Sequence, residues 1–153
     1  GVVLEDYYLE HIMLCLSDGL LAQCGIDLDT HRGEIAAGNL SALRGCPFVL
    51  GSAEDIGGRI GHGLLRSSGV SPVSKATSEN VETLLALCEQ GVGACFCPEN
   101  LLHTALSPEQ LAHLHILPLC PEASYPICFG YLSRSYPWSV LSEFIRIARE
   151  QTA

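Results

Sequence analysis

The sequence is poor in charged residues, and basic residues are especially few. Only 16% of its 153 residues are charged, and eight Lys and Arg stand against 17 Asp and Glu, giving a net charge of −9. A surface that binds phosphate backbones needs clustered cations. These residues are therefore not expected to bind DNA, RNA or an anionic membrane themselves, and any contact with DNA would require a segment outside this chain.

Long apolar runs are also missing. No run approaches the roughly 20 residues that a membrane-spanning helix needs, and no basic segment followed by an apolar one opens the chain, as in a signal peptide. The chain starts at Gly1 rather than at a methionine, so we expect it to be part of a longer protein. Its 48% content of hydrophobic residues excludes intrinsic disorder and suits one domain or a small two-lobed one.

Cysteine is abundant, but its placement does not favour a disulfide framework. Most of the eight cysteines lie inside apolar runs, such as residues 12–16 and 94–97, where cysteine behaves as a small hydrophobic residue. Disulfide-stabilised proteins are short, loop-rich chains with cysteines between polar segments. We therefore expect free thiols and a reducing, cytoplasmic location.

Short apolar segments alternate with segments of helical periodicity. Strands are expected at residues 11–16, 47–50, 72–77, 92–97, 113–119 and 126–132. Helices are expected to start at Ser52, Ser78, Ser107 and about Pro137, the last burying Leu141, Phe144, Ile145 and Ala148. Residues 17–39 are expected to form a loop with at most one short element. This alternation predicts an α/β domain with a largely parallel sheet.

The ends of these strands carry the most informative residues. Ligands of open α/β sheets bind outside the carboxyl ends of the strands. Here those ends are Gly51-Ser52, Thr77-Ser78 and Pro98, and the first two are followed at once by expected helix starts. Backbone N–H groups and hydroxyls would then face one region, and we predict a binding cleft suited to an anion. The alternative is that Ser52 and Ser78 serve only as helix N-caps.

Other residues that could bind a metal or a ligand have structural interpretations as well. Cys95 with Cys97 and His113 with His115 could each place two ligands on one strand face for zinc, but their spacing is shorter than in common zinc sites, and we favour core packing for the cysteines and solvent exposure for the histidines. The glycine-rich segment 57–63 matches neither dinucleotide nor phosphate-loop spacing. Lys75 could pair with an anionic ligand or with Glu79. No residue carries a catalytic signature, so we predict no enzyme activity, no metal and no cofactor.

Several segments resemble one known family. They are EHIMLCLSDGLLAQ (10–23), LSALRGCPFVLG (40–51), residues 59–102 ending in CPENLL, HLHILPLC and YPICFGYLSR. QGVGACFCP, with Gly91, Gly93 and Pro98, is the most telling part, and its cysteines replace the usual aliphatic residues. Together they resemble the effector-binding domain of LysR-type transcriptional regulators, over nearly the whole chain but without the start of the domain.

The resemblance implies a periplasmic-binding-protein-like (type II) fold of two α/β lobes, with mainly the second lobe present. Residues 7–116 would form that lobe with a parallel-rich sheet, and residues 117–153 the return strands and last helix of the first lobe. A small-molecule effector would bind between the lobes near Gly51, Ser52, Thr77 and Ser78, and an anion is one candidate for it. Uncovered strand edges and helix faces would favour a homodimer or higher oligomer.

Two further functional classes remain open from the residues alone. A solute-binding or enzymatic domain of a related two-lobed α/β fold would use the same cleft. An interaction module would use only the surface through which copies associate. Ligand binding without turnover is expected of the sensor and turnover of the enzyme, whereas an interaction module binds no small molecule.

Overall fold

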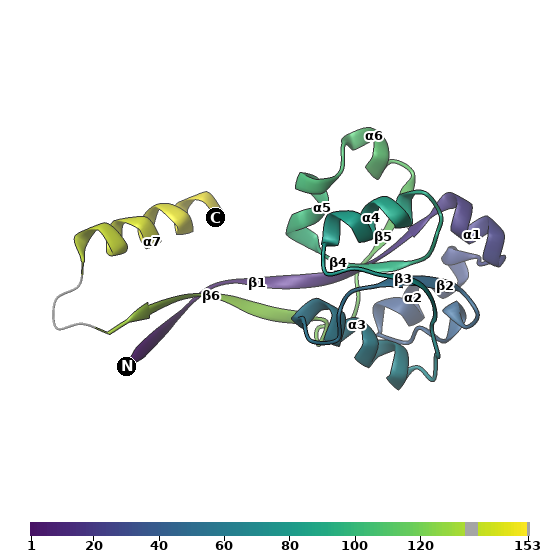
Figure 1. Ribbon diagram of the computed structural model, residues 1–153, viewed down its shortest axis with the longest axis horizontal. Coiled ribbons are helices and arrows are strands. Elements are labelled where there is room, and N and C mark those ends of the chain that lie inside the picture. Colours follow the sequence, from purple (N-terminus) through teal and green to yellow (C-terminus); the bar gives the residue numbers. More distant parts are fainter. Residues whose placement is uncertain (134–137, 153) are drawn as a thin grey trace. The chain divides into compact units, whose positions relative to one another are not determined.

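The computed structural model describes residues 1–133 and 138–152 and divides the chain into two compact units (Figure 1). One unit comprises Gly1–Glu10 with Tyr125–Ala153, and the other comprises His11–Ser124. The first strand, β1 (Val2–Ser17), contributes residues to both units. The assignment of residues 7–116 and 117–153 to two lobes stays a prediction.

The unit His11–Ser124 contains most of the secondary structure. Its further strands are β2 (Pro47–Leu50), β3 (Val73–Thr77), β4 (Cys95–Pro98) and β5 (Leu114–Leu117). Its helices are α1 (Asp18–Cys24), α2 (Leu28–Ala36), the short 3-10 turn η1 (Ser41–Leu43), α3 (Ile56–Ser67), α4 (Val81–Glu89), α5 (Glu99–Ala105) and α6 (Pro108–Leu111). The expected strands are therefore present, although α5 had not been expected.

The sheets of this unit are mixed rather than largely parallel. β1 lies between β4 and β5 and pairs with both in antiparallel register, with Cys15 opposite Cys95 on one side and Ile116 on the other. β2 and β3 form a parallel ladder that ends with Leu50 beside Thr77, and one parallel bridge joins Phe48 of β2 to Ala94, just before β4. The expectation of a parallel-rich sheet is wrong because β1 runs antiparallel to both β4 and β5, and hydrophobic periodicity shows where a strand lies but not the direction of its neighbours.

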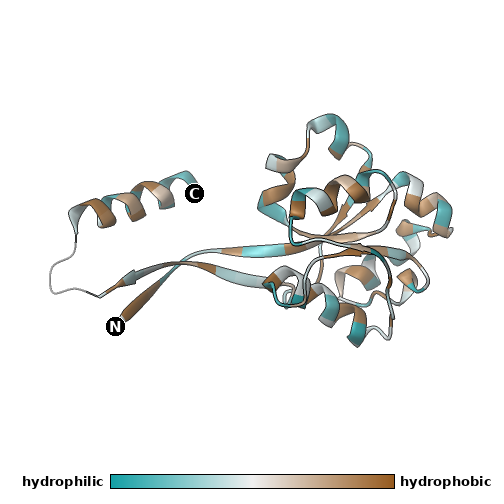
Figure 2. Ribbon diagram, viewed as in Figure 1, coloured by the Kyte–Doolittle hydropathy of each residue, from teal (hydrophilic) through white to brown (hydrophobic). Residues whose placement is uncertain are grey.

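The core of this unit lies between the strands and the helices on both sides of them. Figure 1 shows α4, α5 and α6 on one side and α2 and α3 on the other, and Figure 2 shows hydrophobic residues concentrated along the strands. Fully buried side chains include Leu14, Phe48 and Leu85. Phe48 and Phe96 stack with ring centroids 6.2 Å apart and join β2 to β4.

Residues 17–39 form two helices, which the expectation of a loop missed. The Ser17 hydroxyl accepts a hydrogen bond from Leu20 N–H and begins α1, and Gly25, with φ 65°, ends it. Asp27 caps α2 through Asp29 N–H at 3.1 Å. Polar side chains mark these caps well, but only a few buried residues, such as Leu20, give each short helix an apolar face, so periodicity was a weak signal.

The other unit pairs β1 with β6 (Ser124–Leu132) and adds the helix α7 (Ser139–Thr152). The Tyr7 hydroxyl donates to the Ala148 carbonyl at 3.0 Å, and the Phe129 and Phe144 rings meet edge to face. Ile145 is buried as expected, but Phe144 is 58% exposed, which corrects the prediction of its burial. The expected helix start at Pro137 lies outside the described residues. Among the described residues, no helix is long and apolar enough to span a membrane.

Candidate functional site

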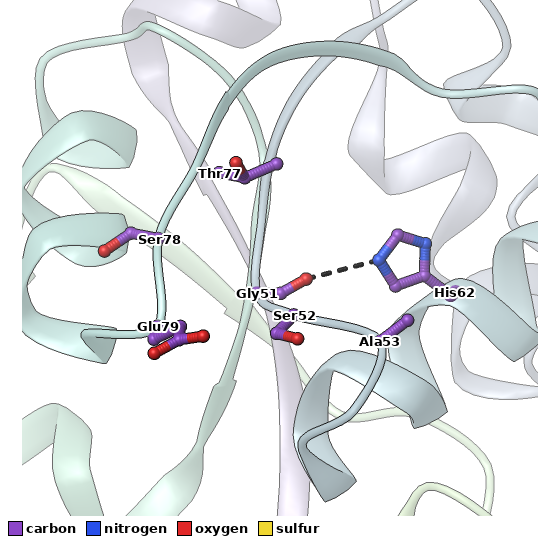
Figure 3. A pocket seen from close by; sticks show the side chains of 7 residues that line it. All are labelled: Gly51, Ser52, Ala53, His62, Thr77, Ser78 and Glu79. Atoms are coloured by element: carbon purple, nitrogen blue, oxygen red, sulfur yellow. Dashed lines mark hydrogen bonds between the residues drawn. The ribbon is translucent and has the colours of Figure 1, made fainter.

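A pocket of about 410 Å³ lies at the carboxyl ends of β2 and β3, within the unit His11–Ser124 (Figure 3). It is lined by Gly51, Ser52, Ala53, His62, Thr77, Ser78 and Glu79. The four residues that the sequence analysis selected, Gly51, Ser52, Thr77 and Ser78, are all in this lining. Whether they bind a ligand stays a prediction.

The parallel ladder brings the two strand ends together. Leu50 pairs with Thr77, and Ser78 N–H donates to the Leu50 carbonyl at 3.2 Å. Both strands therefore reach their carboxyl ends at one edge, as the parallel arrangement requires. Pro98, the third strand end in the sequence analysis, does not line the pocket.

The helix α3 closes the pocket from a third direction. A Cβ atom added to Gly58 would lie 1.9 Å from the Ser52 carbonyl oxygen and 2.8 Å from its carbon. Only glycine allows the helix to approach the strand-end turn this closely. Gly58, which lies in the segment 57–63 that matched no phosphate-binding motif, thus has a packing role beside the pocket.

The two serine hydroxyls act locally, although neither is a helix N-cap. Ser52 Oγ accepts from Glu54 N–H at 3.2 Å and Ser78 Oγ from Asn80 N–H at 3.0 Å, so both stabilise the turns before the helices. A hydroxyl that accepts one hydrogen bond still has a proton to donate. The Ser52 and Ser78 hydroxyls can therefore still donate to a ligand.

The helix starts lie further along the chain than the sequence predicted. Asp55 is the N-cap of α3 and accepts from Gly57 and Gly58 N–H at 3.0 and 3.1 Å. Asn80 is the N-cap of α4 and accepts from Thr83 N–H at 3.0 Å. These caps already use N–H groups that the sequence analysis had assigned to a ligand, because any Ser, Asp or Asn near the start of a helix can serve as its cap.

Sequence reasoning missed two titratable residues of the lining. His62 lies on α3, and its Nε2 is 3.2 Å from the Gly51 carbonyl oxygen. A carbonyl oxygen only accepts, so Nε2 carries the proton and donates it. Glu79 directly follows Ser78 and lies on the other side of Gly51 from His62 (Figure 3). His62 is seven residues after Asp55, on the same helix face, which is the one signal that could have indicated it.

Lysine and arginine do not line the pocket. Lys75, expected near the cleft, is exposed on β3 and forms no ion pair within the described residues. The Glu79 carboxylate likewise has no hydrogen bond or ion pair within residues 1–133 and 138–152. The backbone N–H groups of Ser52 and Ala53 also have no acceptor in that part of the chain. The pocket therefore offers N–H and O–H donors together with one uncompensated carboxylate.

The thiols and imidazoles outside the pocket do not assemble a second site. All eight cysteines are free, and hydrogen bonds with Cys15 and Cys88, together with burial, raise the pKa of Cys95. His115 Nε2 is 2.6 Å from Asp18 Oδ1 at the start of α1. Across the described residues, no three His, Cys, Asp or Glu side chains are grouped so that they could hold a metal ion.

The chain matches the family model described as the LysR substrate binding domain over residues 1–153. Among solved structures, it is similar to the CcmR regulatory domain of Synechocystis PCC6803 in complex with 2-PG, with TM-score 0.70 and 11% identity over 99% of this chain and 67% of that one. It is similar to the effector binding domain of QuiR in complex with shikimate, with TM-score 0.64 and 10% identity over 98% and 65%. These likenesses show the mixed α/β, periplasmic-binding-protein-like type II fold.

The chain is shorter than the proteins whose structures it resembles. Full-length CbnR complexed with its target DNA has TM-score 0.60 and 18% identity to this chain, over 98% of this chain but only 48% of CbnR. The chain thus spans about half of that full-length protein and about two thirds of the CcmR and QuiR domains. The comparison with curated proteins finds no match.

Proposed function

Because this chain belongs to the LysR substrate-binding domain family, we propose that its pocket at the ends of β2 and β3 binds the small-molecule effector of a LysR-type transcription factor. The observation that carries the proposal is the convergence of Gly51, Ser52, Thr77 and Ser78 on one pocket. The CcmR and QuiR domains, which share the fold, were solved with 2-PG and shikimate. The domain senses its ligand and does not transform it.

The donors of the pocket define how a ligand would be held. The Ser52 and Ser78 hydroxyls and the N–H groups of Ser52 and Ala53 would donate to oxygen atoms of the effector, including those of an anionic group. Binding would shift the population of domain conformations, because the effector has different affinities for them. That shift would change the oligomer geometry presented to DNA.

DNA binding would reside in another part of a longer protein. The net charge of −9 and the shortage of basic residues argue against a DNA-binding surface on this chain. Reading the gene upstream of the codon for Gly1 tests this proposal. We expect a helix-turn-helix and a linker helix there, and a signal peptide instead would favour the solute-binding alternative.

We propose that residues 7–116 correspond to the second lobe of the family fold and residues 117–153 to returning parts of the first lobe. The pocket residues all lie in the former range. Because the pocket is contained in the unit His11–Ser124, that part of the chain alone should bind the ligand. Binding by a shorter chain comprising residues 11–124 would show that this unit holds the ligand site, and loss of binding would show that the site needs residues outside it.

The central experiment is calorimetric titration of the full chain with aromatic acids, dicarboxylates and amino acids. We expect saturable binding without turnover, and loss of binding in a Ser52→Ala and Ser78→Ala double variant. A Ser41→Ala and Ser67→Ala double variant serves as the matched control, because neither serine lines the pocket. Turnover of a ligand would favour the enzymatic alternative. The absence of binding heat with every ligand would favour the interaction module.

The predicted homodimer or higher oligomer has a candidate surface on α7. Val140, Phe144 and Ile147 lie along one face of the helix and are 75%, 58% and 43% exposed. Burying this face against a second copy would remove apolar area from water. We expect light scattering to show self-association of the wild-type chain. It should weaken in a double variant with Val140→Ser and Ile147→Ser, but not in the control variant Leu101→Ser. A monomer at high concentration would contradict the proposal.

A further inference from the structure

We propose that the effector carries a cationic nitrogen, which pairs with the Glu79 carboxylate, in addition to an oxygen group held by the hydroxyl and N–H donors. This inference rests on the proposed function and names the chemical class of the ligand. It describes a small ammonium-bearing molecule with an oxygen acceptor at a short distance from the nitrogen.

The charges around the pocket favour a cation at one end of it. Glu79 is the one carboxylate of the lining, and no lysine or arginine lines the pocket. A second carboxylate lies close to Gly51, because Asp55 Oδ2 is 3.4 Å from the position that a Gly51 Cβ would occupy. The charge of Asp55 is already held by two N–H groups of α3, whereas Glu79 has no partner among the described residues. Glu79 is therefore the charge that a ligand would neutralise.

The other titratable group of the lining does not compete for that role. His62 donates its Nε2 proton to the Gly51 carbonyl, so this proton is not offered to an anion in the pocket. The helix starts that could have attracted an anion are capped by Asp55 and Asn80. Because no lysine or arginine lines the pocket, a purely anionic ligand would meet Glu79 without a permanently charged cation beside it, which costs binding free energy through like-charge repulsion.

The remaining donors explain why the ligand also needs an oxygen acceptor. The Ser52 and Ser78 hydroxyls each retain a proton, and Ser52 and Ala53 have free backbone N–H groups. These groups donate and match carboxylate, carbonyl or hydroxyl oxygens. The donors of Ser52 and Ala53 at the turn after β2 and the Glu79 carboxylate at the turn after β3 thus match the two ends of one small molecule, and the Ser78 hydroxyl lies beside the carboxylate (Figure 3).

Paired probes that differ only in the cationic group test the inference. We would titrate the 15N-labelled full chain with L-alanine and L-lactate, L-leucine and L-2-hydroxyisocaproate, and L-phenylalanine and L-3-phenyllactate. In each pair an ammonium replaces a hydroxyl, and the backbone amide shifts of Ser52, Ala53, Ser78 and Glu79 report binding at the pocket. We expect the ammonium member of at least one pair to bind more tightly.

Glu79→Gln removes the charge and keeps the shape of the side chain. We expect it to lower the preference for the ammonium member by about tenfold, as for a hydrogen bond to a charged group. Glu109→Gln on α6 is the control, since Glu109 is exposed and does not line the pocket. It should leave the preference unchanged. Because Glu79 is exposed and unpartnered, its variant should remain folded.

The outcomes separate this inference from the proposed function. Binding of any probe with a preference that Glu79→Gln does not alter, or a preference for the hydroxy acids in the wild-type chain, overturns the inference and leaves the pocket as a ligand site. Absence of shifts at all four amides with every probe overturns the inference and counts against the pocket as the effector site.

Discussion

Gly58 should be the residue of α3 that least tolerates a side chain. A methyl group there would lie 1.9 Å from the Ser52 carbonyl oxygen, whereas ordinary contacts begin at 3.4 Å. To remove this overlap, α3 or the Gly51-Ser52 turn would have to move by about 1.5 Å, the difference between these two distances. The obstacle is backbone, which cannot rotate away as a side chain can.

The cost can be estimated from two opposing effects. Overpacking in a well-packed region costs about 1–3 kcal/mol and at times more, and this overlap is severe. Alanine in a helix interior recovers about 1 kcal/mol relative to glycine. Gly58→Ala should therefore lower the free energy of unfolding by about 2 kcal/mol. Gly63→Ala, on the same helix with nothing within 4 Å of its added Cβ, should raise it by about 0.5–1 kcal/mol.

Urea denaturation followed by circular dichroism compares the two variants in the same helix. The same proteins titrated with a ligand of the pocket should show weaker binding for Gly58→Ala, because Ser52 is displaced, and unchanged binding for Gly63→Ala. If Gly58→Ala is as stable as Gly63→Ala, α3 does not approach the Gly51-Ser52 turn closely enough to exclude a side chain at position 58.

Three further predictions concern stability. Asp55→Ala should lower the free energy of unfolding by about 1–2 kcal/mol in urea denaturation, because two N–H groups of α3 lose their acceptor; an unchanged midpoint would contradict this. Burial and the neighbouring Cys24 raise the pKa of Cys46 from 9.0 to about 12, so the folded thiol stays protonated where the unfolded one ionises. Stability should therefore fall as the pH rises above about 9, and less steeply in Cys46→Ala; identical pH profiles in urea denaturation would exclude this linkage. Arg149→Gln breaks an ion pair with Glu5 at 2.6 Å, in which both side chains are at least one third exposed. We therefore expect the free energy of unfolding to fall by less than about 1 kcal/mol in thermal denaturation. A larger decrease would show that solvent does not screen the pair.

Local signals in the sequence determined much of the fold. The segments Pro47–Leu50 and Val73–Thr77 are strands, and the residues that follow them line one pocket. The Ser107 capping box is present as expected. Gly69 and Gly91 have φ of 65° and 76° just after α3 and α4. These features depend on hydrogen bonds and backbone conformations within a few residues, so composition and spacing suffice to indicate them.

Tertiary structure decided which charges enter the pocket and which do not. From the sequence, Lys75 could have paired with an anionic ligand or with Glu79, four residues along the chain. The pocket lining includes Glu79 but not Lys75, and the two form no ion pair among the described residues. His62 reaches the Gly51 carbonyl because Gly58 lets α3 lie against the turn. The antiparallel place of β1 between β4 and β5 was likewise invisible in the sequence. Strand order and helix approach depend on contacts between residues far apart in the chain, which no local pattern encodes.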